Sequence, residues 1–229
     1  MRVECQQSCR GSDASDRGAS DLTVAGKLFC DRFPPDKIPA LPTCGISLRR
    51  EFPLKNNLEF PEGIHPCEDG LFSHFALALA EKISFCPEAV YHYRQHEQGN
   101  HHQIRKRTAD ILPMIPRWLS LIEEFYEQRH LWKRKAGHLV RFIEHEPFEL
   151  RLLGMPFSPP EQEILYSIIR DFLNAHCTAA ECRRASLHLP FRLLLQSSGF
   201  SDFGRRLRRA GKNTGIRRKL LHFCPVSSW

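Results

Sequence analysis

Apolar residues recur at helical spacing between Glu68 and Lys82, where they form a stripe bounded by polar positions. The members of this stripe are Leu71, Phe72, Phe75, Ala76, Leu79 and Ala80. Two short runs rich in β-branched and aromatic residues follow at 83–86 and 89–94, separated by Pro87 and Glu88. The pattern therefore predicts a buried helix, then two short strands joined by a turn.

Beyond residue 100 the periodicity becomes helical. The predicted helices cover 109–129, 131–144 and 160–175. Pro113 and Pro116 limit where the first helix can begin, because proline lacks the N–H group that a helix interior uses. A proline-rich stretch at 156–160 marks a break before the third helix. We interpret residues 105–190 as a helical appendage.

The two ends of the chain differ from this middle part. Residues 1–21 are polar and rich in glycine, serine and aspartate, so we expect them to be disordered. Residues 191–229 form a basic tail, and the stretch from Ser197 to Trp229 has few core signals, which predicts partial disorder. Residues 22–104 remain as a separate unit whose nature depends on its motifs.

Glu68 and Asp69 begin the predicted buried helix, just after a turn built from Pro61, Gly63 and Pro66. Carboxylates in the first turn of a helix face exposed N–H groups and the positive end of the helix dipole, so they tend to stay ionised. A charged carboxylate held at such a junction can accept a proton from a substrate hydroxyl. Acidic residues also favour this position for structural reasons, so helix capping is the alternative interpretation.

Six short segments are informative together because of their order and the gaps between them. They are Leu48–Phe52, Asn57–Ile64, Glu68–Asp69, Leu71–Phe72, Ala80–Ile83 and Tyr91–His96. Together they resemble the segment that closes the catalytic domain of bacterial family-2 glycosyltransferases, which have a GT-A fold. The resemblance covers residues 45–100, with 24–33 as an upstream piece, which is less than half of the chain. It implies an α/β fragment of a GT-A-like domain over residues 22–104, followed by a mostly helical C-terminal region.

The chain departs from this family in two respects. Family members begin with a hydrophobic strand that starts the nucleotide-binding half of the sheet. They also carry an Asp-x-Asp motif that holds a divalent metal, Mg²⁺ or Mn²⁺, against the donor diphosphate. Neither feature is present, since no two aspartates lie two residues apart. The resemblance therefore implies a C-terminal part of a longer enzyme, without the metal ligands and expected to be inactive alone.

The resemblance also assigns roles to individual residues. In inverting sugar transfer, a carboxylate takes the proton of the acceptor hydroxyl; the matching base is Asp69, with Glu68 as its neighbour or alternate. Arg94 and His96 are candidates to contact the diphosphate or its metal, because arginine offers a forked donor and histidine a ligand nitrogen. A surface arginine and a solvated loop histidine are the alternatives. The implied substrates are a nucleotide-sugar donor and a glycan or lipid-linked acceptor of the polysaccharide or lipopolysaccharide type.

The formal net charge is +7, and the excess is concentrated near the C-terminus. The basic residues there are Arg205, Arg206, Arg208, Arg209, Lys212, Arg217, Arg218 and Lys219, and they interleave with Leu207, Ile216, Leu220, Leu221 and Phe223. This mixture predicts an amphipathic element that rests on an anionic membrane surface, and a solvated basic tail is the alternative. No DNA- or RNA-binding motif accompanies the charge, so we expect no nucleic-acid partner.

Other sequence features bear on location. No apolar run approaches the roughly 20 residues of a membrane-spanning helix, and the first residues lack a signal-peptide pattern. The 9 cysteines are odd in number and irregularly spaced, which favours reduced thiols. Cys177 and Cys182, even with His176 beside them, are too few for a structural zinc site. We therefore expect a cytoplasmic protein, peripheral on the inner face of the cell membrane if its basic tail binds lipid.

Two functions from different classes remain open. The first is a glycosyltransferase segment in which the Glu68–Asp69 pair supplies the base. The second is a non-catalytic helical interaction module, in which this pair only caps its helix and the basic tail binds a membrane or an acidic partner. An open reading frame upstream of Met1 that encodes the missing strand and Asp-x-Asp motif would favour the enzyme.

Overall fold

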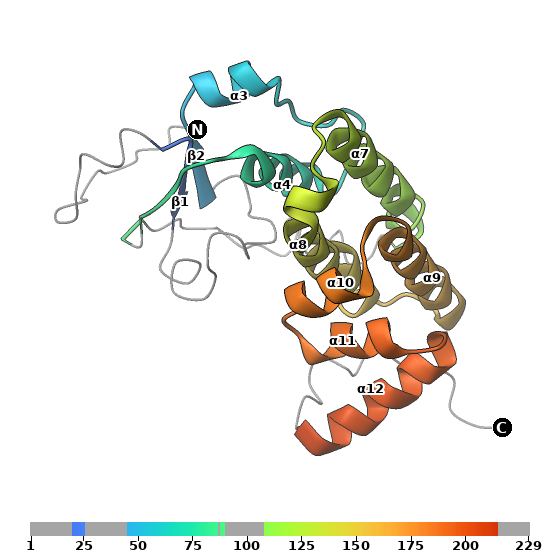
Figure 1. Ribbon diagram of the computed structural model, residues 1–229. Helices are drawn as coiled ribbons and strands as arrows, with labels where there is room; N and C mark the ends of the chain where they lie inside the picture. The colour runs from blue at the N-terminus through green and yellow to red at the C-terminus, as the bar shows by residue number, and fades with distance from the viewer. Residues whose placement is uncertain (1–19, 26–44, 87, 90–107, 215–229) are drawn as a thin grey trace.

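The computed structural model describes residues 20–25, 45–86, 88–89 and 108–214 (Figure 1). This part of the chain is mostly helical and contains one small mixed sheet. The strands are β1 (Leu22–Ala25), β2 (Ile46–Leu48) and β3 (Ile83–Cys86). The helical elements are α3 (Glu51–Asn56), α4 (Glu68–Leu79), α6 (Thr108–Ile111), α7 (Met114–Gln128), α8 (Trp132–Ile143), the π-helical η3 (Glu144–Leu152), α9 (Pro159–His176), α10 (Ala179–Ala185), α11 (Leu189–Gln196) and α12 (Phe200–Thr214).

The sheet has the order β2-β1-β3, with β1 antiparallel to β2 and parallel to β3. Leu22 and Val24 on the central strand are buried, so the sheet contributes to the hydrophobic core. The Asp21 carboxylate accepts hydrogen bonds from the backbone N–H groups of Glu81 and Lys82, at 3.1 and 3.2 Å. These bonds attach the segment that leaves α4 to the start of β1, which fixes α4 relative to the sheet.

The predicted helix at 68–82 and the first predicted strand are present. The helix is shorter than expected, because Ala80 adopts an extended backbone and α4 ends at Leu79. The strand predicted at 83–86 matches β3. Most of the second predicted strand, 89–94, lies outside the described residues, and Ala89, the one residue of it that is described, is not in a strand.

The helix predicted within 109–129, with a start limited by Pro113 and Pro116, corresponds to α7 from Met114, and a break separates it from the short helix α6. The break falls at Leu112 and Pro113, as expected where a proline disfavours helical backbone in the residue before it. Pro116 lies in the first turn of α7, where a missing N–H group leaves no intrahelical bond unmade.

The helix predicted at 131–144 extends further than expected. After α8 the chain continues into η3, in which Leu153 donates its N–H to the carbonyl of Phe148 at 3.0 Å, five residues back. Pro147 lies inside η3 and cannot donate a backbone hydrogen bond. The wider helical turn is a local rearrangement of the kind that such interruptions accompany, and the sequence pattern alone does not reveal it.

Helix α9 confirms the third helix prediction and the break before it. Its N-cap is Ser158, whose N–H and hydroxyl both lie 2.7 Å from the Glu161 carboxylate. This serine–glutamate pair is a capping box, and Pro159 and Pro160 occupy the first helical positions, where proline is tolerated. The local sequence therefore contains a complete helix-start signal.

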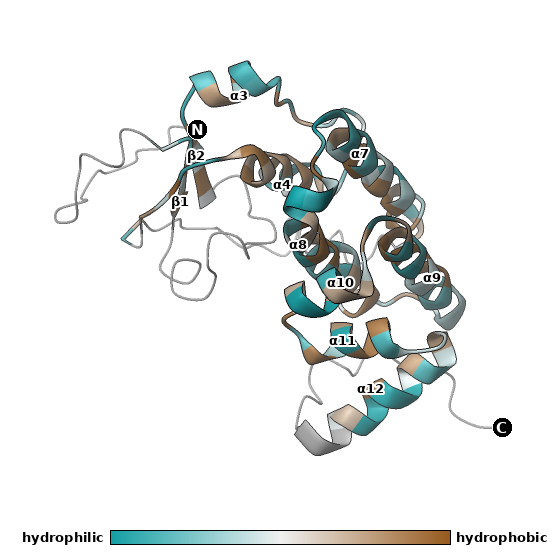
Figure 2. Cartoon of the chain, viewed as in Figure 1, coloured by the Kyte–Doolittle hydropathy of each residue, from teal (hydrophilic) through white to brown (hydrophobic). Residues whose placement is uncertain are grey.

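One hydrophobic cluster extends from the sheet through the helices to α12. Figure 2 shows hydrophobic residues concentrated on α4 and on the inward faces of α7 and α8, with hydrophilic residues along α10 and α12. The side chains of Trp118, Tyr126, Phe142 and Phe191 are all fully buried. The strand-containing part and the helical part therefore share a core.

The expectation of few core signals after Ser197 was wrong for α12. Phe203 and Leu207, four residues apart on this helix, are 0% and 2% exposed. They pack with α11 and α9, which lie beside α12. Each such side chain contributes about 1.5–3 kcal/mol by leaving water, so this first part of the basic tail is a packed helix.

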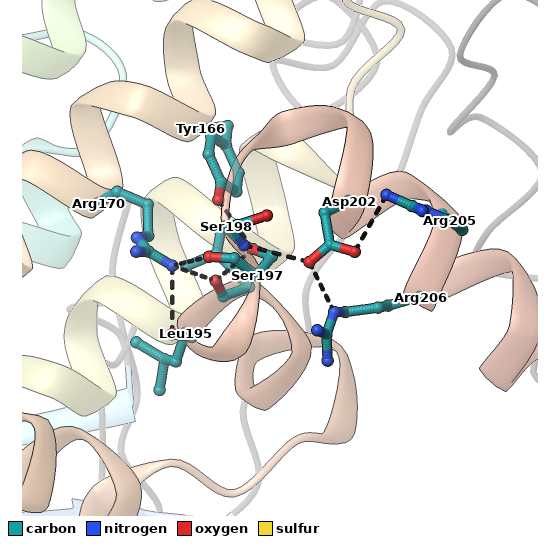
Figure 3. A network of polar contacts seen from close by, with 9 residues as sticks. Tyr166, Arg170, Leu195, Ser197, Ser198, Asp202, Arg205 and Arg206 are labelled. Carbon is teal, nitrogen blue, oxygen red and sulfur yellow. Dashed lines mark hydrogen bonds and ion pairs between the residues drawn. The ribbon is translucent and has the colours of Figure 1, made fainter.

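Arg170 of α9 holds the end of α11 next to the start of α12 (Figure 3). Its guanidinium donates hydrogen bonds to the carbonyl groups of Leu194, Leu195 and Ser197, at 2.7, 3.2 and 2.9 Å. The Tyr166 hydroxyl lies 2.8 Å from the hydroxyl of Ser197. These contacts add hydrogen bonds to carbonyl groups at the end of α11, where the helix itself supplies few donors.

Candidate functional site

The turn before α4 places the acidic pair, Glu68 and Asp69, in the first turn of that helix. Gly63 has φ +67°, a backbone conformation that suits glycine, and the His65–Pro66 peptide bond is cis. Cys67, the N-cap of α4, has φ 95°, which is strained for a residue with a side chain. Glu68 and Asp69 are the first two residues of α4, as the sequence predicts.

The two carboxylates differ in their surroundings. The Glu68 side chain is one-third exposed, and one of its oxygens lies 3.1 Å from Nδ1 of His65. Its other oxygen is buried without a hydrogen-bond partner among the described residues. Asp69 is exposed on the outer side of the helix. Asp69 is thus the carboxylate that a solvent-borne molecule reaches more easily.

A buried ion pair packs against the start of α4, next to Gly70. Glu146 and Arg151 of η3 are each 10% exposed at the side chain, and their charged groups lie 2.9 Å apart. The Arg151 guanidinium also lies 5.4 Å from the ring centre of Trp118. The buried arginine is therefore engaged with Glu146, and Asp69 remains at the surface.

Gly70 allows this pair to approach the helix closely. A Cβ atom at position 70 would lie 3.3 Å from a Glu146 carboxylate oxygen and 3.2 Å from the sulfur of Cys67. Burial, and then the nearby Glu146 charge, raise the pKa of the Cys67 thiol well above its usual value. Cys67 is therefore a neutral packing group at neutral pH and not a nucleophile.

Several residues around the acidic pair were not predicted. His65, Cys67, Glu146 and Arg151 all shape the start of α4, yet none was a candidate from the sequence. His65 lies three residues before Glu68, a spacing that could have indicated a contact. The ion pair of η3 comes from a segment far along the chain, and nothing in the sequence near Glu68 points to it.

The two residues predicted to contact the donor diphosphate or its metal cannot be placed beside this pair. Arg94 and His96 lie outside the described residues. Within the described ranges, no three His, Cys, Asp or Glu side chains are grouped so that they could hold a metal ion. The structure thus places the base candidates Glu68 and Asp69, and it adds no ligand set for the metal that the resemblance implies.

A second polar cluster lies in the core between α4, α7 and α8. Nε2 of His74 lies 3.1 Å from the Tyr126 hydroxyl, and the His138 ring stacks on His74 with 4.3 Å between centres. His138 also donates to the backbone carbonyl of His74 at 3.1 Å. Burial raises the pKa of Tyr126 well above its usual value, so its hydroxyl stays protonated. This fully buried cluster joins three helices, and we assign it no chemistry.

The basic residues of α12 lie on its outer face. Arg205, Arg208 and Arg209 are exposed, whereas Leu207 faces the core. Asp202 pairs with Arg206 at 2.8 Å and with Arg205 at 3.4 Å. In the amphipathic element expected from the sequence, Leu207 therefore packs into the core. The remaining apolar residues of that expectation, from Ile216 onward, lie outside the described residues.

Comparisons with known proteins add no family. No protein-family model matches the chain, and neither the curated proteins nor the solved structures contain a significant match. Among the described helices, none is both long enough and apolar enough to span a bilayer.

Proposed function

We propose that this protein is the acceptor-side part of a family-2 glycosyltransferase with a GT-A-like catalytic fold, and that Asp69 is its general base. The reaction transfers a sugar from a nucleotide-sugar donor to a polysaccharide or lipopolysaccharide-type acceptor. One observation carries the proposal: an exposed aspartate in the first turn of a buried helix, within the segment that resembles this family. The mixed sheet beside α4 is compatible with an α/β catalytic domain.

The position of Asp69 suits proton removal. Asp69 lies in the first turn of α4, and a carboxylate held at such a position can accept a proton from a substrate hydroxyl. Its exposure leaves room for an acceptor hydroxyl. Glu68 is half-buried and held by His65, so we assign it the role of a neighbour that holds the turn and not that of the base. The buried Glu146–Arg151 pair keeps this helix start in place.

The divalent metal that the family uses does not fit the described residues. They provide no group of three ligating side chains, and the buried carboxylate of Glu146 is already paired with Arg151. We therefore derive no step through a metal. What this chain contributes is the acceptor side of the reaction: a fixed helix start and one accessible carboxylate.

The test is a sugar-transfer assay on the longer enzyme of which we propose this chain to be the acceptor-side part, with and without the Asp69→Asn substitution. General-base catalysis contributes about 10²–10⁴ in rate, so we expect transfer to fall by at least about 100-fold. Asp110→Asn is the matched control, because Asp110 is also an exposed acidic residue in the first turn of a helix. Circular dichroism should show the same helix content in both variants.

The outcomes separate the roles of the acidic pair. Full transfer by Asp69→Asn rules out Asp69 as the base. A large loss in Glu68→Gln with normal transfer in Asp69→Asn assigns the base to Glu68 instead. Absence of transfer by the unsubstituted longer enzyme, with a panel of nucleotide sugars and lipid-linked glycans, argues for the non-catalytic module.

A second candidate function is supported by the exposed arginines of α12. A non-catalytic module of this kind would bind an anionic membrane surface through Arg205, Arg208 and Arg209. Because Phe203 and Leu207 are buried in the core, this helix would adsorb by charge and would not insert apolar side chains. Each basic residue close to an anionic surface contributes about 1 kcal/mol.

Vesicle sedimentation tests this second function. The chain should pellet with phosphatidylserine-containing vesicles at low salt, and the triple variant Arg205→Gln, Arg208→Gln, Arg209→Gln should stay in the supernatant. The double variant Arg183→Gln, Arg184→Gln is the control, because these exposed arginines lie on α10. Equal binding to uncharged phosphatidylcholine vesicles, or equal loss in the control, would contradict the assignment to α12.

A further inference from the structure

Two cysteines flank the N-cap of α10. Thr178 is the N-cap, and it forms a capping box with Glu181: the threonine hydroxyl accepts from the N–H of Glu181 at 3.2 Å, and the Glu181 carboxylate accepts from the N–H of Thr178 at 2.8 Å. Cys177 is therefore the residue before the cap, and Cys182 is the fourth residue of the helix. These two positions pack against each other in the hydrophobic staple that accompanies a capping box. In this chain both members of the staple carry a thiol.

Both thiols are free, and Cys177 packs against the hydrophobic cluster to which Cys182 belongs. Cys182 is 5% exposed and belongs to the core cluster, and Cys177 is partly exposed at the end of α9. Interaction with the Cys177 thiol lowers the pKa of Cys182, and the same interaction raises that of Cys177. The sulfur of Cys182 thus gains thiolate character, and the thiolate is the reactive form of cysteine. Glu181 and Arg183 are the nearby charged groups of α10 that act on Cys182.

We propose that Cys177 and Cys182 are an oxidation site, at which hydrogen peroxide converts the thiol pair into a disulfide that links the end of α9 to α10. The Cys182 thiolate attacks one peroxide oxygen, the O–O bond breaks, and hydroxide leaves, so that Cys182 becomes a sulfenic acid. The Cys177 sulfur then attacks the Cys182 sulfur, an S–S bond forms, and the S–O bond breaks. The Cys177 proton leaves with the oxygen as water. Two thiols and one peroxide thereby give one disulfide and two waters.

Burial of Cys182 selects the oxidant. Because Cys182 is almost fully covered, a small molecule such as hydrogen peroxide reaches it, whereas a bulky disulfide such as oxidised glutathione does not. The other described cysteines lack the arrangement. Cys67 is buried and its pKa is raised by burial and by Glu146, and the Cys86 sulfur lies 3.8 Å from the Glu88 carboxylate. We therefore expect the thiols of Cys177 and Cys182 to react with hydrogen peroxide before those of Cys67 and Cys86 do.

Peptide mapping tests the proposal. The folded chain is treated with increasing hydrogen peroxide, the peroxide is removed with catalase, and free thiols are blocked with N-ethylmaleimide in guanidinium. Trypsin then cuts after Arg170 and Arg183, and the peptide 171–183 contains both staple cysteines and no other. We expect this peptide to become lighter by two hydrogen atoms and to lose both maleimide groups, while the peptides with Cys67 and Cys86 stay labelled.

Variants make the result specific. Cys177→Ser should abolish the loss of two hydrogens, and Cys67→Ser should leave it intact. Serine at position 177 replaces a partly exposed residue, so this variant does not depend on repacking the core as Cys182→Ser does. The proposal is overturned if peptide 171–183 keeps two labelled thiols while Cys67 or Cys86 oxidises. Conversion of its cysteines to sulfonic acids without any disulfide also overturns it.

Discussion

Glu144 is a fully buried carboxylate that joins two distant parts of the helical region. One of its oxygens accepts hydrogen bonds from the backbone N–H groups of Leu187 and His188, at 3.0 and 2.7 Å, and the other pairs with the guanidinium of Arg141. Leu187 and His188 lead into α11, whereas Arg141 and Glu144 lie where α8 meets η3. Arg141 is also buried, and burial lowers its pKa to about 10.

Glu144→Ala should lower the free energy of unfolding by about 3–5 kcal/mol. Removing one partner of a buried ion pair costs about that much, because the other charge is left uncompensated. The N–H groups of Leu187 and His188 also lose their acceptor, and this loss adds to the cost because both hydrogen bonds are part-buried. Glu144→Gln keeps the shape and one acceptor oxygen but loses the charge, so we expect about 1.5–3 kcal/mol.

Urea unfolding followed by circular dichroism measures these changes. The midpoint should fall in the order wild type, Glu144→Gln, Glu144→Ala, with the slope of the transition unchanged. Glu163→Gln is the control, since Glu163 is an exposed glutamate on α9 and should change the free energy by less than about 0.5 kcal/mol. A Glu144→Ala variant within about 1 kcal/mol of wild type would refute the reasoning about the buried pair.

Three further measurements follow from the structure. Hydrogen bonds with Thr178 lower the pKa of Glu181 from its ordinary 4.5, so the α10 capping box contributes stability above pH 4.5 that is lost as the pH falls through the lowered pKa. Glu181→Gln should therefore flatten the dependence of the melting temperature on pH below about 5, and an unchanged dependence would contradict this role. Arg170→Met removes the donor to three carbonyl groups and should cost about 1.5–3 kcal/mol in urea unfolding, whereas Arg192→Met, which removes one bond to Ser186, should cost less. In titration calorimetry, this chain alone should bind nucleotide sugars with a Kd above about 1 mM, and tight metal-dependent binding would show that a donor site is present after all.

Local signals in the sequence predicted α4 and α9 well. Both helices have an apolar stripe at helical spacing and a start defined by nearby residues: Glu68 after a proline–glycine turn, and Ser158 with Glu161. The information that fixes these helices lies within one or two turns of the chain. Such features can be predicted without knowledge of the rest of the fold.

Helix α12 shows where this reasoning failed. Its apolar side consists of few large residues, Phe203 and Leu207, set among arginines, so the segment resembles a solvated or membrane-binding tail. Only the neighbouring helices show that these two side chains fill the core. Tertiary packing decides the place of this helix, and hydrophobic spacing could not reveal it.

The candidate site contains one feature that nearby sequence predicts and one that depends on packing across the fold. The acidic pair at the start of α4 could be predicted because its position depends on the adjacent turn. Its support could not, because Glu146 and Arg151 come from η3 and approach the helix only where Gly70 leaves space. The helical region is therefore more than an addition to a strand-containing unit, since it supplies the ion pair on which the base candidate rests. An enzyme built on Asp69 would need this region for its geometry even if every substrate contact lay elsewhere.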